Sequence, residues 1–352
     1  MKIQLTCKLY DGDARYFIDP ILNIEELDLL TLYRDKDLEE NTKLINVNNK
    51  QKLPKFLILI VRFLKMLSAI SRTSVIVGIY EIPHGLLALL CGAIGNKPVV
   101  ISIIGNPKFA IRNQGIRGWV TRMMYKHANV ITVTGSNAKV FLVEEKGVKE
   151  EKVVILPNSI PCKDFKKLDI DKQYDLITLG RLSHEKGLFT LLEIVKNLKY
   201  EFPTIKLGIA GKGPLLEELK KKVIELELEN NIDLLGYVDD LTMFLNSGKI
   251  FMTTSETEGL PRTVIQSMSC GTPAIASNVG DMSDLVIEGV TGYLVNDFSD
   301  IETFSDKIKI LLLDEKKRLL FSSSSIQFAK DKYDHVCATK TWKSIFKQLK
   351  LI

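Results

Sequence analysis

Short apolar runs alternate with segments of helical periodicity along the second half of the chain. The runs YDLITLG (174–180) and IKLGIAG (205–211) both end at glycine, and the apolar positions of LFTLLEIVKNLK (188–199) between them recur at helical spacing. Short runs of this kind, separated by helices, are typical of βαβ units in a parallel sheet. The pattern therefore predicts a doubly wound α/β sheet, in which ligands bind at the carboxyl ends of the strands.

The first half shows the same alternation less clearly. Its strand candidates are SVIVGIY (74–80), KPVVISIIG (97–105), NVITVTG (129–135) and VVILPNSIP (153–161). A charged linker follows the last of these, so we place a domain boundary near Phe165. The pattern predicts an N-terminal Rossmann-like domain over 1–165, a second over 166–325, and a helical segment over 326–352 that carries Trp342.

The apolar segment FLILIVRFLKMLSAI (56–70) requires a separate interpretation. It has 15 residues and carries Arg62 and Lys65 in its middle. A spanning helix needs about 20 apolar residues, so we expect that this segment does not cross a bilayer. Two interpretations stay open: a buried core helix, or an amphipathic helix in a membrane interface with its two basic residues on one face.

Composition indicates a soluble globular protein. The chain has 352 residues, of which 45% are hydrophobic and 26% charged, enough for two domains with their own cores. Its five cysteines are scattered without a CxxC pair, which predicts reduced thiols in a cytoplasmic protein. The N-terminus MKIQLTCKLYDGD has no apolar signal-peptide core, so we expect no secretion signal.

The net charge of +5 is unevenly distributed. Residues 1–165 hold 23 lysines and arginines against 16 acids, and no acid occurs between Glu81 and Glu144. The basic residues in that acid-free stretch are Lys97, Lys108, Arg112, Arg117, Arg122, Lys126 and Lys139. This excess of positive charge favours binding of phosphate groups or of an acidic membrane surface. A solvated basic face explains the excess equally well.

Two strand-to-helix loops in the second half carry candidate ligand-binding residues. In LGRLSHEKG (179–187), Gly180 ends a strand, and Arg181 and Lys186 precede a helix. A planar guanidinium and a mobile ammonium together suit a diphosphate. In IAGKGPLLEEL (209–219), Gly213 completes a GxG, but Leu216 stands where the dinucleotide fingerprint needs glycine or alanine, which disfavours a nicotinamide-dependent dehydrogenase.

A third candidate is EGLPRTVIQSMSCGTP (258–273). Glu258 precedes a Gly-Leu-Pro turn, and Pro261 suits the first residue of a helix. The N–H groups at that helix start form an anion site, beside which Glu258 accepts hydrogen bonds from hydroxyls. Gln266, eight residues after Glu258, is expected to point toward the same crevice. Taken alone, the acids of SETEG (255–259) are explained by their favourable charge at a helix N-terminus.

The order of these motifs is informative. GRLSHEKG, GKGP, GYVDD (236–240), SETEGLP and CGTPAIASNVGDMSDLVIEGVTGYLV follow one another along the chain. Together they resemble the donor-binding domain of the retaining glycosyltransferases of family 4, and the resemblance covers roughly residues 130–352. It implies the α/β GT-B fold, in which two facing Rossmann-like doubly wound domains have a cleft between them. It also implies that the final helix crosses back toward the N-terminal domain.

The resemblance also implies roles for individual residues. Arg181 and Lys186 would hold the nucleotide diphosphate. Glu258 would contact hydroxyls of the donor sugar, with the backbone N–H groups of Gly259 and Leu260 nearby. The further positions expected to bind the donor are Gly180, Gly213, Val238 and Gln266. Gln266 occupies the place of a glutamate that usually contacts the ribose, and an amide replaces a charge-assisted hydrogen bond with a neutral one.

The first half departs from the family pattern. Ile104 stands where the family often has a histidine before glycine. His84, in YEIPHGLLA, is the nearest candidate substrate-binding histidine, with a structural role as the alternative. The glycine-rich loop of the family is reduced to YDGDAR around Gly12. Residues that bind the acceptor therefore cannot be transferred by resemblance.

We expect a retaining, metal-independent hexosyltransferase with no cofactor, whose substrate is a UDP-sugar rather than a GDP-sugar. The expected acceptor is a lipid-linked or growing surface polysaccharide. The chain is expected to be cytoplasmic, with peripheral contact to an anionic inner membrane face and no nucleic-acid partner. The alternatives are a non-catalytic glycosyltransferase-like subunit, favoured by Ile104 and Gln266, and a sugar-nucleotide epimerase, for which we find no acid and base residues.

Overall fold

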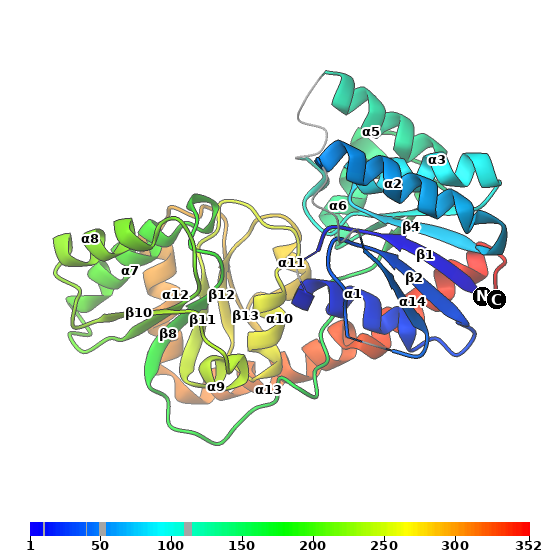
Figure 1. Cartoon of the computed structure of the whole chain (residues 1–352). Helices are drawn as coiled ribbons and strands as arrows, with labels where there is room; N and C mark the ends of the chain where they lie inside the picture. The colour runs from blue at the N-terminus through cyan, green and yellow to red at the C-terminus, as the bar shows by residue number, and fades with distance from the viewer. Residues whose placement is uncertain (10, 40, 49–53, 109–114) are drawn as a thin grey trace. The chain divides into compact units, whose positions relative to one another are not determined.

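The computed structural model describes residues 1–9, 11–39, 41–48, 54–108 and 115–352. Arg112, one of the basic residues of the acid-free stretch, lies outside this described part. The described residues form two compact units, which we call unit 1 (Met1–Ser159 with His335–Ile352) and unit 2 (Ile160–Asp334). Each unit contains one parallel sheet covered by helices, so the expected α/β class is confirmed (Figure 1).

Unit 1 is built on a seven-stranded sheet in the order β3-β2-β1-β4-β5-β6-β7, with every described pair parallel. The strands are β1 (Lys2–Thr6), β2 (Leu29–Tyr33), β3 (Leu44–Val47), β4 (Val75–Ile79), β5 (Val99–Ser102), β6 (Val130–Val133) and β7 (Val153–Ile155). All residues of β4, β5 and β6 are buried, because helices cover both faces of the sheet.

The helices of unit 1 form two layers. They are α1 (Asp11–Leu22), α2 (Lys55–Ser68), α3 (Leu86–Gly95), α5 (Ile116–His127), α6 (Ser136–Val140) and α14 (His335–Gln348), with the short turns η1 (Ile70–Arg72), η2 (Glu81–Gly85), η3 (Phe141–Glu145) and η4 (Glu150–Lys152). In Figure 1, α2, α3 and α5 lie on one face of the sheet, and α1 and α14 lie on the other. α3 packs against both α2 and α5.

The last helix, α14, belongs to unit 1 although it follows unit 2 in the sequence. Its Trp342 is 1% exposed, meets Phe17 of α1 edge to face at 5.5 Å between ring centroids, and stacks on Phe346 at 5.5 Å. Aromatic pairs of this kind contribute about 0.5–1.5 kcal/mol beyond the area that they bury. The final segment is therefore held by apolar packing on α1.

Unit 2 has a six-stranded parallel sheet in the order β10-β9-β8-β11-β12-β13. Its strands are β8 (Tyr174–Leu179), β9 (Leu207–Ala210), β10 (Ile232–Gly236), β11 (Gly248–Thr253), β12 (Ala274–Ser277) and β13 (Gly292–Val295). Its helices are η5 (His184–Lys186), α7 (Leu188–Lys199), α8 (Leu216–Glu225), α9 (Leu241–Asn246), α10 (Arg262–Ser269), α11 (Met282–Leu285), α12 (Ile301–Leu313) and α13 (Glu315–Tyr333). Side chains of α7, α8 and α12 pack into one buried apolar core.

The unit boundaries differ from those expected from the sequence. The first falls between Ser159 and Ile160, not near Phe165, because Ile160 N–H donates to the Tyr333 carbonyl at 2.9 Å and so joins unit 2. The second falls between Asp334 and His335, not at 326, because α13 runs unbroken to Tyr333 and packs against α10. Helices lie on both sides of Asp334, which is itself extended, so a helical pattern does not reveal this break.

The apolar segment 56–70 forms most of α2. Its two basic residues do not share one face, as the amphipathic interpretation required. Arg62 does not lie on a surface face with Lys65, because its side chain is 6% exposed and ion-pairs with Asp35 at 2.6 Å. The exposed face of α2 instead carries Phe56, Ile60 and Leu64. Among the helices described, none is long and apolar enough to cross a membrane.

Candidate functional site

The candidate donor site lies where the strand order of unit 2 reverses. β8 is the first strand of the unit, and its neighbours β9 and β11 lead the chain to opposite sides of the sheet. Loops that leave two such adjacent strands diverge and form a crevice at their carboxyl ends, the usual ligand site of a doubly wound sheet. Here these loops are 180–187 after β8 and 254–261 after β11.

The two loops are joined at Gly187. Its φ of +59° is in the left-handed region, and a Cβ at this position would lie 1.9 Å from the Thr254 carbonyl oxygen. The Thr254 hydroxyl donates to the Gly187 carbonyl at 2.9 Å, and Glu256 N–H donates to the Glu185 carbonyl at 2.9 Å. Only glycine permits so close an approach, and the approach fixes where Lys186 lies relative to the second loop.

Lys186 and Glu258, from the two loops, form an ion pair. The distance from Lys186 Nζ to Glu258 Oε1 is 2.6 Å, and the Ser255 hydroxyl donates to the same oxygen at 2.8 Å. The Lys186 side chain is 26% exposed and the Glu258 side chain 11% exposed. The carboxylate is therefore oriented by two donors in a partly desolvated position, where charge-assisted bonds are stronger than in water.

Arg181 remains available at the surface of the first loop. It is exposed and has no ion pair among the interactions described for residues 115–352. The neighbouring acid, Glu185, is instead held by the Ser183 hydroxyl at 2.6 Å, and this hydrogen bond lowers the pKa of Glu185. The guanidinium can thus receive an anionic ligand without first breaking an ion pair.

The charged residues surround a small cavity of about 20 Å³. Its lining includes Gly180, Arg181, Lys186, Ser255, Glu258 and Thr263. This is room for about one water molecule, so this cavity does not enclose a sugar. A larger ligand would rest on the loops or displace the ion-paired side chains.

Glycines in the loop after β9 let that loop pack closely against the loop after β8. A Cβ on Gly211, whose φ is +142°, would lie 1.7 Å from the Gly180 carbonyl oxygen, and one on Gly213 would lie 2.1 Å from the Leu182 carbonyl oxygen. Leu182 N–H donates to the Lys212 carbonyl at 3.0 Å. The GKG sequence therefore lets two loop backbones pack together, which fits the absence of a dinucleotide fingerprint.

Gly280 supports Glu258 and was not anticipated from the sequence. Its φ is +60°, and a Cβ there would lie 2.1 Å from the Glu258 carbonyl oxygen. The next residue, Asp281, donates its N–H to the Gly259 carbonyl at 3.0 Å. The NVGD segment after β12 thus holds the Glu258–Gly259 backbone in place. The signal in the sequence was a glycine three residues after the short apolar run AIAS (274–277).

The remaining predicted donor residues lie around these loops. Leu260 is 2% exposed, and Pro261 is the N-cap of α10, so the helix begins one residue later than expected. Gln266, within α10, is 4% exposed and is not among the described residues that line the small cavity. Val238 follows β10 beside Tyr237, whose ring faces Lys212 Nζ at 4.9 Å from its centroid.

Unit 1 has a different arrangement at its own strand-order reversal, between β1 and β4. His84, in the turn after β4, is 3% exposed, and its Nδ1 lies 2.9 Å from the Thr6 hydroxyl and 3.3 Å from Arg62 Nη1. A guanidinium only donates hydrogen bonds, so Nδ1 is an acceptor and the neutral ring carries its proton on Nε2. Burial, followed by the charge of Arg62, lowers the pKa of His84 to about 3.

His84 also lines a pocket of about 440 Å³ within unit 1. The pocket lining includes Lys8, Glu81, Asn106 and Arg117. The Tyr125 hydroxyl donates to Glu81 Oε1 at 2.6 Å, and burial raises the pKa of Glu81. Unit 1 thus offers a polar pocket whose lining includes a neutral His84 and a buried Glu81.

The other unit 1 candidates lie at the same sheet edge. Gly12 is in the first turn of α1, directly after the β1 loop, so the reduced glycine-rich segment has become part of a helix. Ile104 follows β5 and packs partly buried against the apolar core. Of the predicted site residues, Gly180, Arg181, Lys186 and Glu258 are therefore gathered around one cavity in unit 2, whereas His84 and Gly12 belong to unit 1.

This chain is similar to known glycosyltransferases. Residues 162–327 match the family model described as Glycosyl transferases group 1. The chain is 28% identical over 255 residues to an undecaprenol-linked-glycan alpha-1,4-N-acetyl-D-galactosaminyltransferase of Campylobacter jejuni, covering 70% of this chain and 67% of that one. It is 35% identical over 171 residues to the O-antigen biosynthesis glycosyltransferase WbnH of Escherichia coli, covering 47% and 46%.

Among solved structures, HepE of Anabaena in complex with UDP superposes with a TM-score of 0.82 at 17% identity, covering 99% of this chain and 100% of that one. At such identity the likeness establishes the fold. The alignments with the curated relatives span about two thirds of their length or less. Residues 162–327 therefore form a glycosyl transferases group 1 domain, in a chain of two Rossmann-like units with the GT-B fold.

Proposed function

We propose that this chain transfers a sugar from a nucleoside-diphosphate donor to a glycan, as a retaining glycosyltransferase of the family 4 type that needs no metal. The observation that carries the proposal is the convergence of Arg181, Lys186 and Glu258 at the strand-order reversal of unit 2. Two cations and one carboxylate on neighbouring loops suit a ligand that has a diphosphate at one end and hydroxyls at the other.

Each residue has a role in the proposed reaction. The acceptor hydroxyl oxygen forms a bond to the anomeric carbon as the bond from that carbon to the phosphate oxygen breaks. The acceptor proton moves to the leaving phosphate oxygen. Arg181 and Lys186 stabilise the charge that builds on the diphosphate, and preorganised groups of this kind contribute about 3–4 kcal/mol each. Glu258 positions the sugar by accepting from its hydroxyls.

We propose a UDP-sugar as donor, supported by the UDP and UDP-glucose complexes of HepE. The proposed acceptor is a lipid-linked or growing surface glycan, supported by the undecaprenol-linked and O-antigen names of two relatives. The proposal includes a cytoplasmic location with peripheral contact to an anionic inner membrane face.

The test is titration calorimetry of the full chain with UDP, GDP and ADP, followed by thermal-shift screening with the corresponding sugar nucleotides. We expect UDP to bind and a UDP-sugar to raise the melting temperature. Lys220→Ala serves as the control variant, because it removes an exposed i,i+3 ion pair on α8. It should bind UDP as tightly as the wild type. Binding of GDP or ADP alone would overturn the choice of donor.

The second candidate is a non-catalytic glycosyltransferase-like subunit. It is favoured by Ile104, which replaces an expected histidine with a partly buried apolar side chain, and by buried Gln266. If a folded chain binds none of the nucleotides, the subunit interpretation replaces the enzyme.

A further inference from the structure

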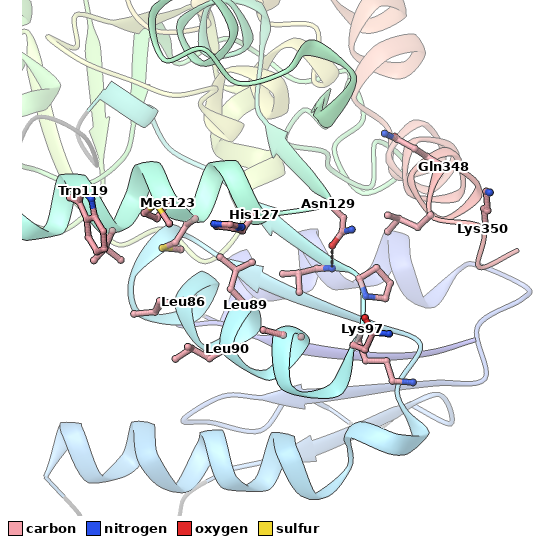
Figure 2. Close-up of a pocket in the computed structure, with 18 residues that line it drawn as sticks. Leu86, Leu89, Leu90, Lys97, Trp119, Met123, His127, Asn129, Gln348 and Lys350 are labelled. Carbon is pink, nitrogen blue, oxygen red and sulfur yellow. Dashed lines mark hydrogen bonds between the residues drawn. The ribbon is translucent and has the colours of Figure 1, made fainter.

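An apolar groove lies between α3 and α5 of unit 1. Its volume is about 930 Å³, and the start of β5 and residues 348–350 close one end. Figure 2 shows Trp119, Met123 and His127 along α5 above Leu86 and Leu89 of α3. The size suits a ligand of drug or lipid-tail dimensions.

The helical layer that forms the groove exposes large apolar side chains. We call this layer, formed by α2, α3 and α5, the helical face. Its exposed apolar residues are Phe56, Ile60 and Leu64 on α2, Leu90 and Ile94 on α3, and Ile116, Trp119 and Met123 on α5. Because α3 packs against both other helices, these residues lie over adjacent elements. Soluble monomers rarely expose so many large apolar residues together unless the surface binds something.

The same face is basic. Lys97, His127 and Lys350 line the groove, and Arg122 and Lys126 are exposed on α5. No acid occurs in the sequence from 82 to 143, so α3 and α5 carry no negative charge. Apolar side chains with tryptophan and basic residues on the same helices are typical of surfaces that lie in a membrane interface.

The charge also argues against a symmetric dimer through this face. In a two-fold interface the same patch meets itself, so the basic residues of α5 would face those of the second copy without acids from α3 or α5 to pair with them. An anionic lipid surface supplies the missing charge, at about 1 kcal/mol for each lysine or arginine near it.

We propose that the helical face binds an anionic phospholipid bilayer, with a lipid tail in the groove between α3 and α5 and its phosphate near Lys97, His127 and Lys350. This inference extends the membrane contact of the proposed function. Its test uses vesicles without donor or sugar acceptor, so the lipid contact and the sugar transfer can fail independently.

Two tryptophans make the test direct. Trp119 is 59% exposed, whereas Trp342 is 1% exposed. Fluorescence of the full chain is recorded with vesicles of phosphatidylcholine alone and with phosphatidylglycerol added. We expect a blue shift with the anionic vesicles only, weaker at high salt, and quenching by lipids brominated in the middle of the chain. Trp119→Phe should lose the spectral change but still sediment with the vesicles.

Charge and apolar variants identify the surface. Lys97→Glu with Arg122→Glu, and separately Trp119→Glu, should each weaken vesicle co-sedimentation at least tenfold and leave UDP affinity unchanged. Lys220→Glu in unit 2 is the matched control and should bind vesicles like the wild type. Equal binding by all variants, or no binding to anionic vesicles, overturns the proposal. So does sedimentation velocity that shows a dimer dissociated by Trp119→Glu, since a second copy would then cover this face.

Discussion

The charged side chains near the strand-order reversal are arranged differently in the two units. In unit 2 the charged residues come from two short loops, and Arg181 is exposed while Lys186 and Glu258 are only partly buried. In unit 1 Arg62 and His84 are buried, and each depends on an element distant in sequence, since Arg62 pairs with Asp35 and His84 contacts Thr6. Two units of the same fold thus differ, because unit 2 presents exposed cations that can bind an anion and unit 1 has a buried polar network.

The difference shows which kind of site a sequence reveals. Charged residues in a glycine-bounded loop are close together in the chain, so their chemistry can be recognised locally. A buried network is stable only if every member is satisfied, and its members are brought together by the sheet order.

The largest expected effect is loss of transfer on removing the unit 2 cations. Arg181→Ala or Lys186→Ala should lower turnover by about 10²–10³-fold, because each removes a preorganised group that stabilises the leaving diphosphate. The measurement is release of nucleoside diphosphate from the donor that binds, with circular dichroism to check folding. Lys220→Ala should retain full activity. Normal turnover in both site variants would contradict the assignment of Arg181 and Lys186 to the diphosphate of the donor.

The second effect concerns the backbone that holds Glu258. Gly280→Ala and Gly289→Ala both place alanine at positive φ, which costs about 1–2 kcal/mol. Only Gly280 contacts the site, since a Cβ on Gly289 meets nothing within 4 Å. Gly280→Ala should therefore lose more stability than its control in urea unfolding, and should also lose UDP-sugar affinity. Equal effects of the two variants would show that the Gly280 contact does not support Glu258.

The third effect is a pH dependence that arises in unit 1. The pKa of His84 is about 3 in the folded chain and about 6.5 when unfolded. The unfolded state therefore binds more protons below pH 6.5, and stability is lost progressively as pH falls toward 3.

Between pH 7.5 and pH 5 this loss amounts to about 2 kcal/mol. Urea midpoints of the wild type and of His84→Gln at both pH values isolate the contribution, because the other groups titrate in both proteins. The variant should lose less stability on acidification. An identical loss would mean that His84 is not buried as a neutral ring.

The smallest expected effect is at Gln266. Gln266→Glu places a carboxyl at a position that is 4% exposed, so we expect a lower melting temperature without ligand. If the resemblance holds, the new charge-assisted bond to a ribose should tighten UDP binding by about tenfold or less, roughly 1 kcal/mol. Calorimetry with UDP decides between the alternatives, since weaker binding would show that the amide makes a specific contact.

The alternation of strands and helices in unit 2 could be predicted from apolar periodicity and from the glycines at the ends of β8, β9 and β10. The gathering of Arg181, Lys186 and Glu258 was expected from the resemblance to the family 4 glycosyltransferases, because periodicity predicts a parallel sheet but not the order of its strands. The contacts of Gly187 with Thr254 and of Gly280 with Glu258 could not be predicted, because they depend on how separate loops approach one another. The burial of Arg62 was missed for the same reason, since Asp35 and His84 lie far from it in the sequence.

The position of α14 has a consequence for biosynthesis. Chains emerge from the ribosome N-terminus first, and domains generally fold as units. Unit 2 is continuous and can complete its core once Asp334 is outside the exit tunnel. Unit 1 needs Trp342 to cover Phe17, so the half made first is finished last. Until then α1 exposes an apolar surface to chaperones, and a chain truncated before His335 would consist of a complete unit 2 attached to an incomplete unit 1.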